Sequence, residues 1–174
     1  MAEPVFVVPY DPRWPSLFAL ERSRVEAAVD PWVEAVEHVG STAVPGLDAK
    51  PVIDLMVGVR DIQGAGRCIR PLEEIGYSYW AENPNPERML FVRFVDTGRT
   101  SRTHNLHVVE AGGDLWNDRL VFRDHLRSHP EAAGEYAHFK YVLAERFRDD
   151  REAYTRAKTD FISAILERAR ASRA

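Results

Sequence analysis

The nine residues PVIDLMVGV, at positions 51–59, constrain the fold of this chain more than any other segment. They are almost continuously apolar and rich in β-branched side chains, which is typical of a central strand that is buried on both faces. Asp54 is their one charged residue. Because a buried carboxylate is costly unless a cation or hydrogen-bond donors meet it, we expect the same segment to carry a site at Asp54.

Hydrophobic periodicity and turn residues predict the elements on either side of this strand. In chain order we expect a helix over 16–29, a strand over 33–39, a turn-rich loop over 40–50, the central strand over 51–59, a helix over 61–75, a short strand over 77–80, two hairpin strands over 88–95 and 103–110, and three helices over 114–127, 130–148 and from about 149 onward. This order indicates an α+β fold in which helices pack on a mixed sheet. We expect one domain over residues 1–174, with a sheet-containing core over 1–112 and a C-terminal helical segment over 113–174.

The composition excludes several classes of protein. With 174 residues, 45% apolar and 29% charged, the chain is long enough for a core and too apolar for intrinsic disorder. The net charge of −4 and the pI of about 5.9 argue against a nucleic-acid partner. A single cysteine, Cys68, excludes an internal disulfide. No segment approaches the roughly 20 apolar residues of a membrane span, and the chain does not begin like a signal peptide, so we expect a cytoplasmic protein that has no membrane partner.

The turn-rich loop before the central strand has the residues of a phosphate-binding turn. Gly40 lets the backbone approach a ligand closely, and Ser41 and Thr42 add hydroxyl groups beside exposed N–H groups. Asp54 follows on the next strand, and a divalent metal bound to nucleotide phosphates is one answer to its buried charge.

The strand over 103–110 offers a second candidate group. Asn105 and His107 share one face of it by the two-residue period of a strand. If this strand lies beside the Asp54 strand, His107 is a metal ligand with Asp54, a general base, or a core histidine held by a hydrogen bond. We name Asp54 and His107 as the candidate catalytic and metal-binding residues.

Four cationic side chains are candidate phosphate ligands. Only three of the 23 basic residues are lysines, which suggests that a compact ammonium is needed at Lys50, Lys140 and Lys158. Lys50 ends the turn-rich loop, whereas Lys140 and Lys158 lie among aromatic residues of two expected helices. The alternatives are a lysine that merely flanks a strand, and lysines that snorkel from a packed face. Arg93 stands among apolar residues of a strand, so it either pairs with a carboxylate such as Asp54 or faces a ligand.

The spacing of Gly40-Ser41 and Asp54 resembles the nucleotidyltransferase superfamily. In that superfamily a Gly-Ser turn handles the phosphates of an NTP, and a strand shortly after it carries Asp-x-Asp or Asp-x-Glu, whose carboxylates hold Mg²⁺. Position 56 is Met in this chain, so the resemblance implies a metal site that lacks at least one ligand.

The order of the longer motifs resembles the GrpB family, also called UPF0157, across nearly the whole chain. The motifs are GSTAVPGLDAKPVIDL, HNLHV, LVFRDHLRSHP, YAHFKYVLAERF and YTRAKTDFI. The resemblance implies a nucleotidyltransferase-like fold. It also implies a relation to the domain fused behind dephospho-CoA kinase in some bacteria, where that domain is described as an aid to folding.

Two functions follow as hypotheses. The first is transfer of a nucleotidyl or phosphoryl group from an NTP to an acceptor, with Mg²⁺ or Mn²⁺ as the cofactor. The second is a non-catalytic module that binds a nucleotide or a CoA-like phosphate compound, or assists a separate dephospho-CoA kinase. The chain has no Gly-x-x-x-x-Gly-Lys-Ser/Thr loop, so a kinase activity of its own is not expected.

Overall fold

A computed structural model describes residues 4–95 and 101–171 of the chain. The helices are α1 (Trp14–Val29), α2 (Ile69–Glu74), α3 (Asp114–Ser128), α4 (Pro130–Arg146), α5 (Arg151–Ala157) and α6 (Thr159–Ala171), with two 3₁₀ segments, η1 (Ser41–Ala43) and η2 (Ile62–Cys68). The strands are β1 (Val33–Val39), β2 (Ile53–Val59), β3 (Ser78–Tyr79), β4 (Arg88–Phe94) and β5 (Arg102–Glu110).

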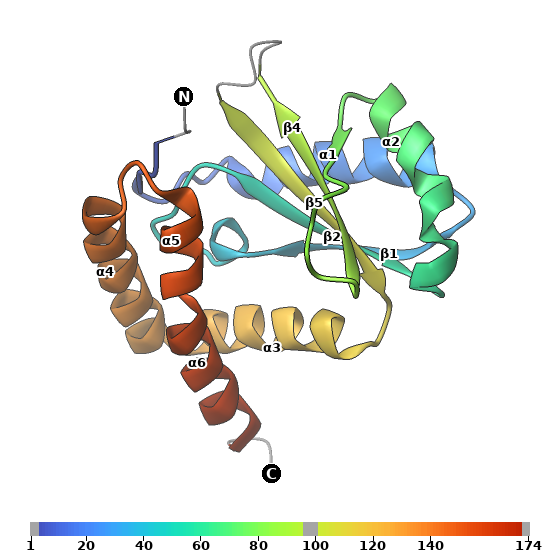
Figure 1. The fold of residues 1–174 in the computed structure, drawn as a ribbon. Helices are drawn as coiled ribbons and strands as arrows, with labels where there is room; N and C mark the ends of the chain where they lie inside the picture. The colour runs from blue at the N-terminus through green and yellow to red at the C-terminus, as the bar shows by residue number, and fades with distance from the viewer. Residues whose placement is uncertain (1–3, 96–100, 172–174) are drawn as a thin grey trace.

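The strands form one mixed sheet in the order β1-β2-β5-β4-β3 (Figure 1). β2 and β5 pair in parallel, whereas the other three pairs are antiparallel. The predicted α+β fold with a mixed sheet is therefore confirmed, and so is the β4–β5 hairpin. Most of the expected connection between these two strands, residues 96–100, lies outside the described residues. The apolar segment at 51–59 supplies β2, which lies between two neighbours as its burial requires.

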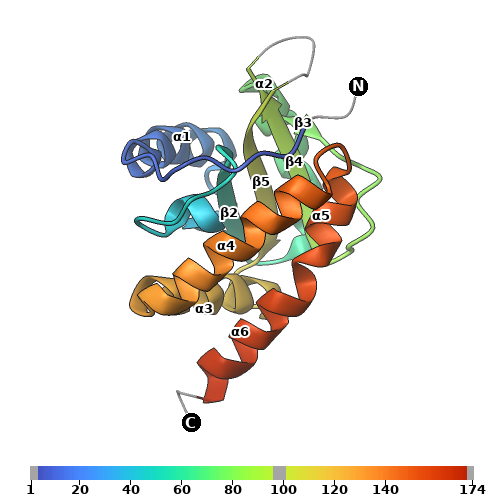
Figure 2. The same ribbon diagram turned by 90° about the vertical axis from the view of Figure 1, so that its left-hand side faces the viewer.

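Helices cover both faces of the sheet, as Figures 1 and 2 show. α1 and α2 cover one face, where Leu55, Phe91 and Leu106 belong to the largest apolar cluster. α3 covers the other face, where Trp116 packs in a cluster with Met56. α4 and α6 contact α3, and α5 connects them. None of the helices within residues 4–95 and 101–171 is long and apolar enough to cross a membrane.

Two expected helices differ from the structure for local reasons. The helix expected over 61–75 begins as the 3₁₀ segment η2, which contains Gly64 and Gly66, and only Ile69–Glu74 is α-helical. The last expected helix is divided into α5 and α6 at Lys158, where the backbone N–H of Lys158 bonds to the oxygen of Thr155, three residues back. Four helices rather than three therefore follow β5 in the described part of the chain.

Candidate functional site

Asp54 lies on the sheet face that α3 covers, next to two side chains of β5. The parallel register sets Asp54 beside Asn105 and Met56 beside His107, so the two strands are adjacent, which is the condition stated above for His107 to lie near Asp54. Asn105 Nδ2 donates to Asp54 Oδ1 at 2.7 Å, and His107 Nε2 lies 3.8 Å from the same oxygen. The Asp54 side chain is 24% exposed, so solvent reaches the group at this point.

The turn between β1 and β2 lies directly against this carboxylate. Gly40 has a φ of 72° and a ψ of −173°, a conformation that is essentially restricted to glycine. A Cβ atom at this position would come within 2.4 Å of Asp54 Oδ2, so only a residue without a side chain admits the carboxylate. Ser41, the next residue, is a hydrogen-bond partner of the Tyr136 phenol on α4. The predicted turn and the predicted carboxylate are therefore in contact.

The surroundings keep Asp54 ionised and His107 neutral near pH 7. Burial disfavours the charged form of Asp54, but His107, Asn105 and the Arg119 guanidinium outweigh burial and lower its pKa to about 2. Burial, followed by the charge of Arg119, lowers the pKa of His107 to about 4. The pair is thus a carboxylate beside a neutral imidazole.

Three cationic side chains lie near enough to Asp54 to interact with its charge. Arg88 begins β4, Arg119 is on α3, and Lys158 lies between α5 and α6. The charge of Asp54 acts on all three side chains. Burial lowers the pKa of each of them, that of Lys158 to about 8. One carboxylate therefore faces three cations that have lost part of their hydration.

Buried nitrogen atoms of this group lack hydrogen-bond partners. Within residues 4–95 and 101–171 they are Nε of Arg88, Nε of Arg119 and Nδ1 of His107. Buried polar atoms without partners are uncommon because each one costs about 1–3 kcal/mol. The two arginines of this group therefore have unused donors as well as excess positive charge, which are the properties of a site for an anion.

The residues do not fit the metal site that the sequence suggests. In the described part of the chain, no group of three or more His, Cys, Asp or Glu side chains could hold an ion. Met56, at the place of the second carboxylate of the superfamily, is fully buried in an apolar cluster with Trp116. Asp54 and His107 alone, beside three cations, are a poor ligand set for Mg²⁺ or Mn²⁺.

The two helical lysines lie in the same region but have different surroundings. Lys158 interacts with the charge of Asp54, and Lys140 interacts with the charge of Lys158. Lys140 is buried and donates to the backbone oxygen of Asp48 in the turn-rich loop. Burial lowers the pKa of Lys140 to about 7. Lys158 is therefore the lysine that faces Asp54, and Lys140 holds the loop.

Thr42 and Lys50 are two further predicted phosphate ligands, and both belong to the turn-rich loop. Thr42 is buried, and its hydroxyl lies 3.0 Å from His38 Nε2, so it stabilises the turn from within. Lys50 has a buried Nζ at the end of the loop. A contact between Lys50 and phosphate stays a prediction.

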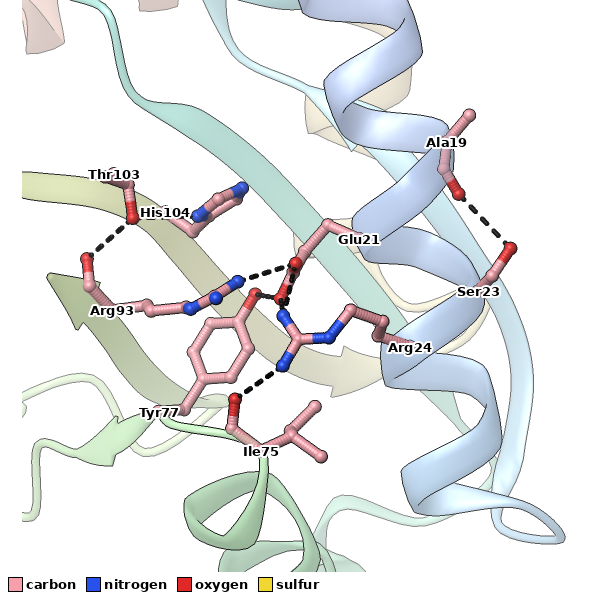
Figure 3. A network of polar contacts seen from close by, with 9 residues as sticks. All are labelled: Ala19, Glu21, Ser23, Arg24, Ile75, Tyr77, Arg93, Thr103 and His104. Atoms are coloured by element: carbon pink, nitrogen blue, oxygen red, sulfur yellow. Dashed lines mark hydrogen bonds and ion pairs between the residues drawn. The ribbon is translucent and has the colours of Figure 1, made fainter. Parts of the chain in front are cut away.

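Arg93 lies on the opposite face of the sheet and pairs with a carboxylate, as one of the two alternatives predicted, but the carboxylate is that of Glu21 and not that of Asp54. Arg93 Nη1 donates to Glu21 Oε2 at 2.7 Å, as Figure 3 shows. Glu21 is a buried residue of α1, and it also accepts hydrogen bonds from the Tyr77 hydroxyl and from Arg24. This network joins α1 to the edge of the sheet, so the Arg93 charge is compensated by the fold.

Sequence reasoning missed Arg88 and Arg119. Positions 88 and 93 of β4 differ by an odd number, so the two arginine side chains point to opposite faces of the sheet, and Arg88 is on the face of Asp54. Arg119 follows Trp116 by three residues, which places both side chains on the same face of α3. The strand and helix periods were available signals for both residues, but they do not say which face meets Asp54.

Comparisons with known proteins agree with the fold and its motifs. The sequence model of the GrpB protein family matches residues 4–168. UPF0157 protein PA4798 of Pseudomonas aeruginosa is 46% identical over 167 residues, which cover 95% of this chain and 68% of that protein. A dephospho-CoA kinase of Mycolicibacterium paratuberculosis is 29% identical over 187 residues, which cover 95% of this chain and 46% of that kinase. The crystal structure of conserved protein GrpB from Enterococcus faecalis superimposes with a TM-score of 0.84 at 32% identity, and covers 94% of this chain and 96% of that one. Because the family match spans almost the whole sequence and the solved structure shares the fold, the chain belongs to the GrpB family.

Proposed function

We propose that this chain binds a small molecule with two or more linked phosphate groups, of the nucleoside diphosphate or CoA type, on the sheet face around Asp54. The observation that carries the proposal is an excess of partly buried positive charge, because Arg88, Arg119 and Lys158 all interact with the charge of a single carboxylate. A monoanion would leave part of this charge unbalanced, whereas a diphosphate group carries enough negative charge to match it.

The residues of the site have distinct roles in this proposal. The turn at Gly40, which admits the Asp54 carboxylate, would present its backbone N–H groups and the Ser41 hydroxyl to a phosphate. Arg119 presents a planar fork of donors, which suits phosphate oxygens, and Lys158 supplies a compact charge. Asp54 attracts these cations and, through repulsion, limits where the ligand's own negative charges can lie.

The comparison with a kinase supports a CoA-like ligand. The Mycolicibacterium paratuberculosis relative is named dephospho-CoA kinase, and its matching part is 46% of its length. Dephospho-CoA carries a diphosphate, which is the chemistry that the cations favour. A binding module that assists a separate kinase of this type in the cytoplasm is therefore part of the proposal.

Nucleotidyl transfer is a second candidate, favoured by the contact between the Gly40 turn and Asp54. In such a reaction an acceptor oxygen or nitrogen would bond to the α-phosphorus of an NTP while pyrophosphate leaves. Release of pyrophosphate from NTPs, with and without Mg²⁺ or Mn²⁺, tests this candidate, and a rate equal to that of Asp54→Asn would refute it.

Calorimetric titration of the full chain with ADP and with pyrophosphate, carried out both in excess EDTA and in excess Mg²⁺, tests the binding proposal. We expect saturable binding that weakens as salt is added, because charge drives it. Lys158→Met should weaken binding at least about tenfold, equivalent to about 1.4 kcal/mol. Arg156→Met is the matched control, because Arg156 is an exposed cation of α5, the helix that ends just before Lys158. Absence of binding, or equal losses in the two variants, would refute the proposal.

A further inference from the structure

The donor set at Asp54 leaves little for a divalent metal to bind. Oδ1 accepts a hydrogen bond from Asn105 at 2.7 Å, and His107 also approaches it. Oδ2 lies against the Gly40 backbone, where even a methyl group would come within 2.4 Å. Both oxygens of the one carboxylate are therefore already in contact with the protein.

The neighbouring position that would complete a two-carboxylate site is apolar. Met56 is fully buried and packs with Val39, Val109 and Trp116. A metal ion there would lose water and gain no oxygen ligand in return. The cost of removing an ion from water without replacement ligands is large.

Two guanidinium groups already supply positive charge near Asp54, where a metal ion would act. Arg119 and Arg88 come from α3 and β4, respectively, and both have a buried Nε without a hydrogen-bond partner in residues 4–95 and 101–171. Their guanidinium groups repel a divalent cation but match the oxygens of a phosphate. Because strand and helix hold them, these groups need little reorganisation when a ligand arrives.

From these observations we infer that the site takes its diphosphate ligand in the metal-free form, with the guanidinium groups of Arg88 and Arg119 in the role that Mg²⁺ has in nucleotidyltransferases. This inference rests on the proposed diphosphate-binding function and specifies the ionic form of the ligand. A ligand bound to Mg²⁺ carries less negative charge, and it would bring the Mg²⁺ ion toward the two guanidinium groups. Mg²⁺ should therefore compete with binding rather than support it.

The test compares the affinity of the full chain for pyrophosphate and for ADP in excess EDTA and in excess Mg²⁺. We expect binding in EDTA to be as tight as in Mg²⁺ or tighter. An affinity at least about tenfold weaker in EDTA would overturn the inference and leave the proposed binding function intact. Absence of binding under both conditions would overturn the proposed function itself.

Variants of Arg119 test whether the guanidinium supplies the charge. In EDTA, Arg119→Gln should weaken pyrophosphate binding at least about tenfold, and Arg119→Lys should weaken it less, because the charge remains while the fork of donors is lost. Arg60→Gln is the control, because Arg60 is exposed and pairs with Glu34 away from Asp54.

Thermal unfolding of the same variants separates a binding role from a structural one. Without ligand, Arg119→Gln should unfold at the same temperature as the unmodified chain or a higher one, because a partly buried charge whose buried Nε lacks a partner is removed. With pyrophosphate in EDTA, the unmodified chain should gain stability and Arg119→Gln should not. Metal-free binding that is unaffected by Arg119→Gln would overturn the assignment to this residue.

Discussion

Gly40 is the position at which one methyl group tests the geometry of the site most directly. In Gly40→Ala, an alanine must adopt a φ of 72° and a ψ of −173°, which costs about 1–3 kcal/mol. Its Cβ must also move away from Asp54 Oδ2, which it would approach to 2.4 Å, at a further cost of about 1–3 kcal/mol. The free energy of unfolding should therefore fall by about 2–6 kcal/mol in total.

Urea unfolding followed by circular dichroism measures this loss, and Gly46→Ala is its matched control. Gly46 also has a positive φ, 77°, but a Cβ there would meet no atom within 4 Å. Its loss should be confined to the backbone conformation, about 1–2 kcal/mol. The difference between the two variants is then the contact with Asp54.

A double-mutant cycle assigns that difference to the carboxylate. Asp54→Ala removes the two nearest atoms, Oδ2 and Cγ, and leaves only a Cβ at 3.2 Å from the new methyl group. Gly40→Ala should therefore cost at least about 1 kcal/mol less in the Asp54→Ala background. If Gly40→Ala costs no more than Gly46→Ala, or if the cycle shows no coupling, the turn does not lie against Asp54.

Three other predictions concern the core and the sheet faces. Met56 is fully buried, so Met56→Glu should lower the free energy of unfolding by about 3 kcal/mol or more without creating a metal site. Met56→Leu, its control, should cost less than about 1.5 kcal/mol. Stabilisation of Met56→Glu by added metal in calorimetry would contradict this prediction. Glu21→Gln removes the buried carboxylate that pairs with the partly exposed Arg93 and Arg24, and it should cost about 1.5–3 kcal/mol in urea unfolding. Glu26→Gln, which breaks an exposed pair on the same helix, should cost less than about 1 kcal/mol, and equal losses would refute this role of Glu21. Burial lowers the pKa values of His38 and His107 from 6.5 to about 4, so between these pH values the unfolded chain binds more protons than the folded one. The free energy of unfolding should therefore fall by up to about 3 kcal/mol for each histidine as the pH decreases from 6.5 to 4. A His38→Gln variant whose stability has the same pH dependence between about pH 4 and 7 would contradict this.

The elements that the sequence predicted well are those whose signals are local. The apolar run at 51–59 could satisfy its burial only between two strands, and β2 lies there. The two-residue period placed Asn105 and His107 on one face of β5, which the register confirms. Gly40 was expected to let the backbone approach a ligand closely, and in the structure it is the Asp54 carboxylate that comes close to it.

The composition of the charged site was decided by tertiary structure. Arg88 and Arg93 stand on opposite faces of β4, and only the antiparallel register with β5 determines that Arg88 shares the face of Asp54. Arg119 reaches the same face because α3 packs across it through Trp116. Strand and helix periods are properties of neighbouring residues, whereas register and helix packing depend on contacts between distant segments. The sequence alone therefore determined that this chain has a turn, a buried strand and a carboxylate in it, and the tertiary structure decided that the groups around this carboxylate are cations.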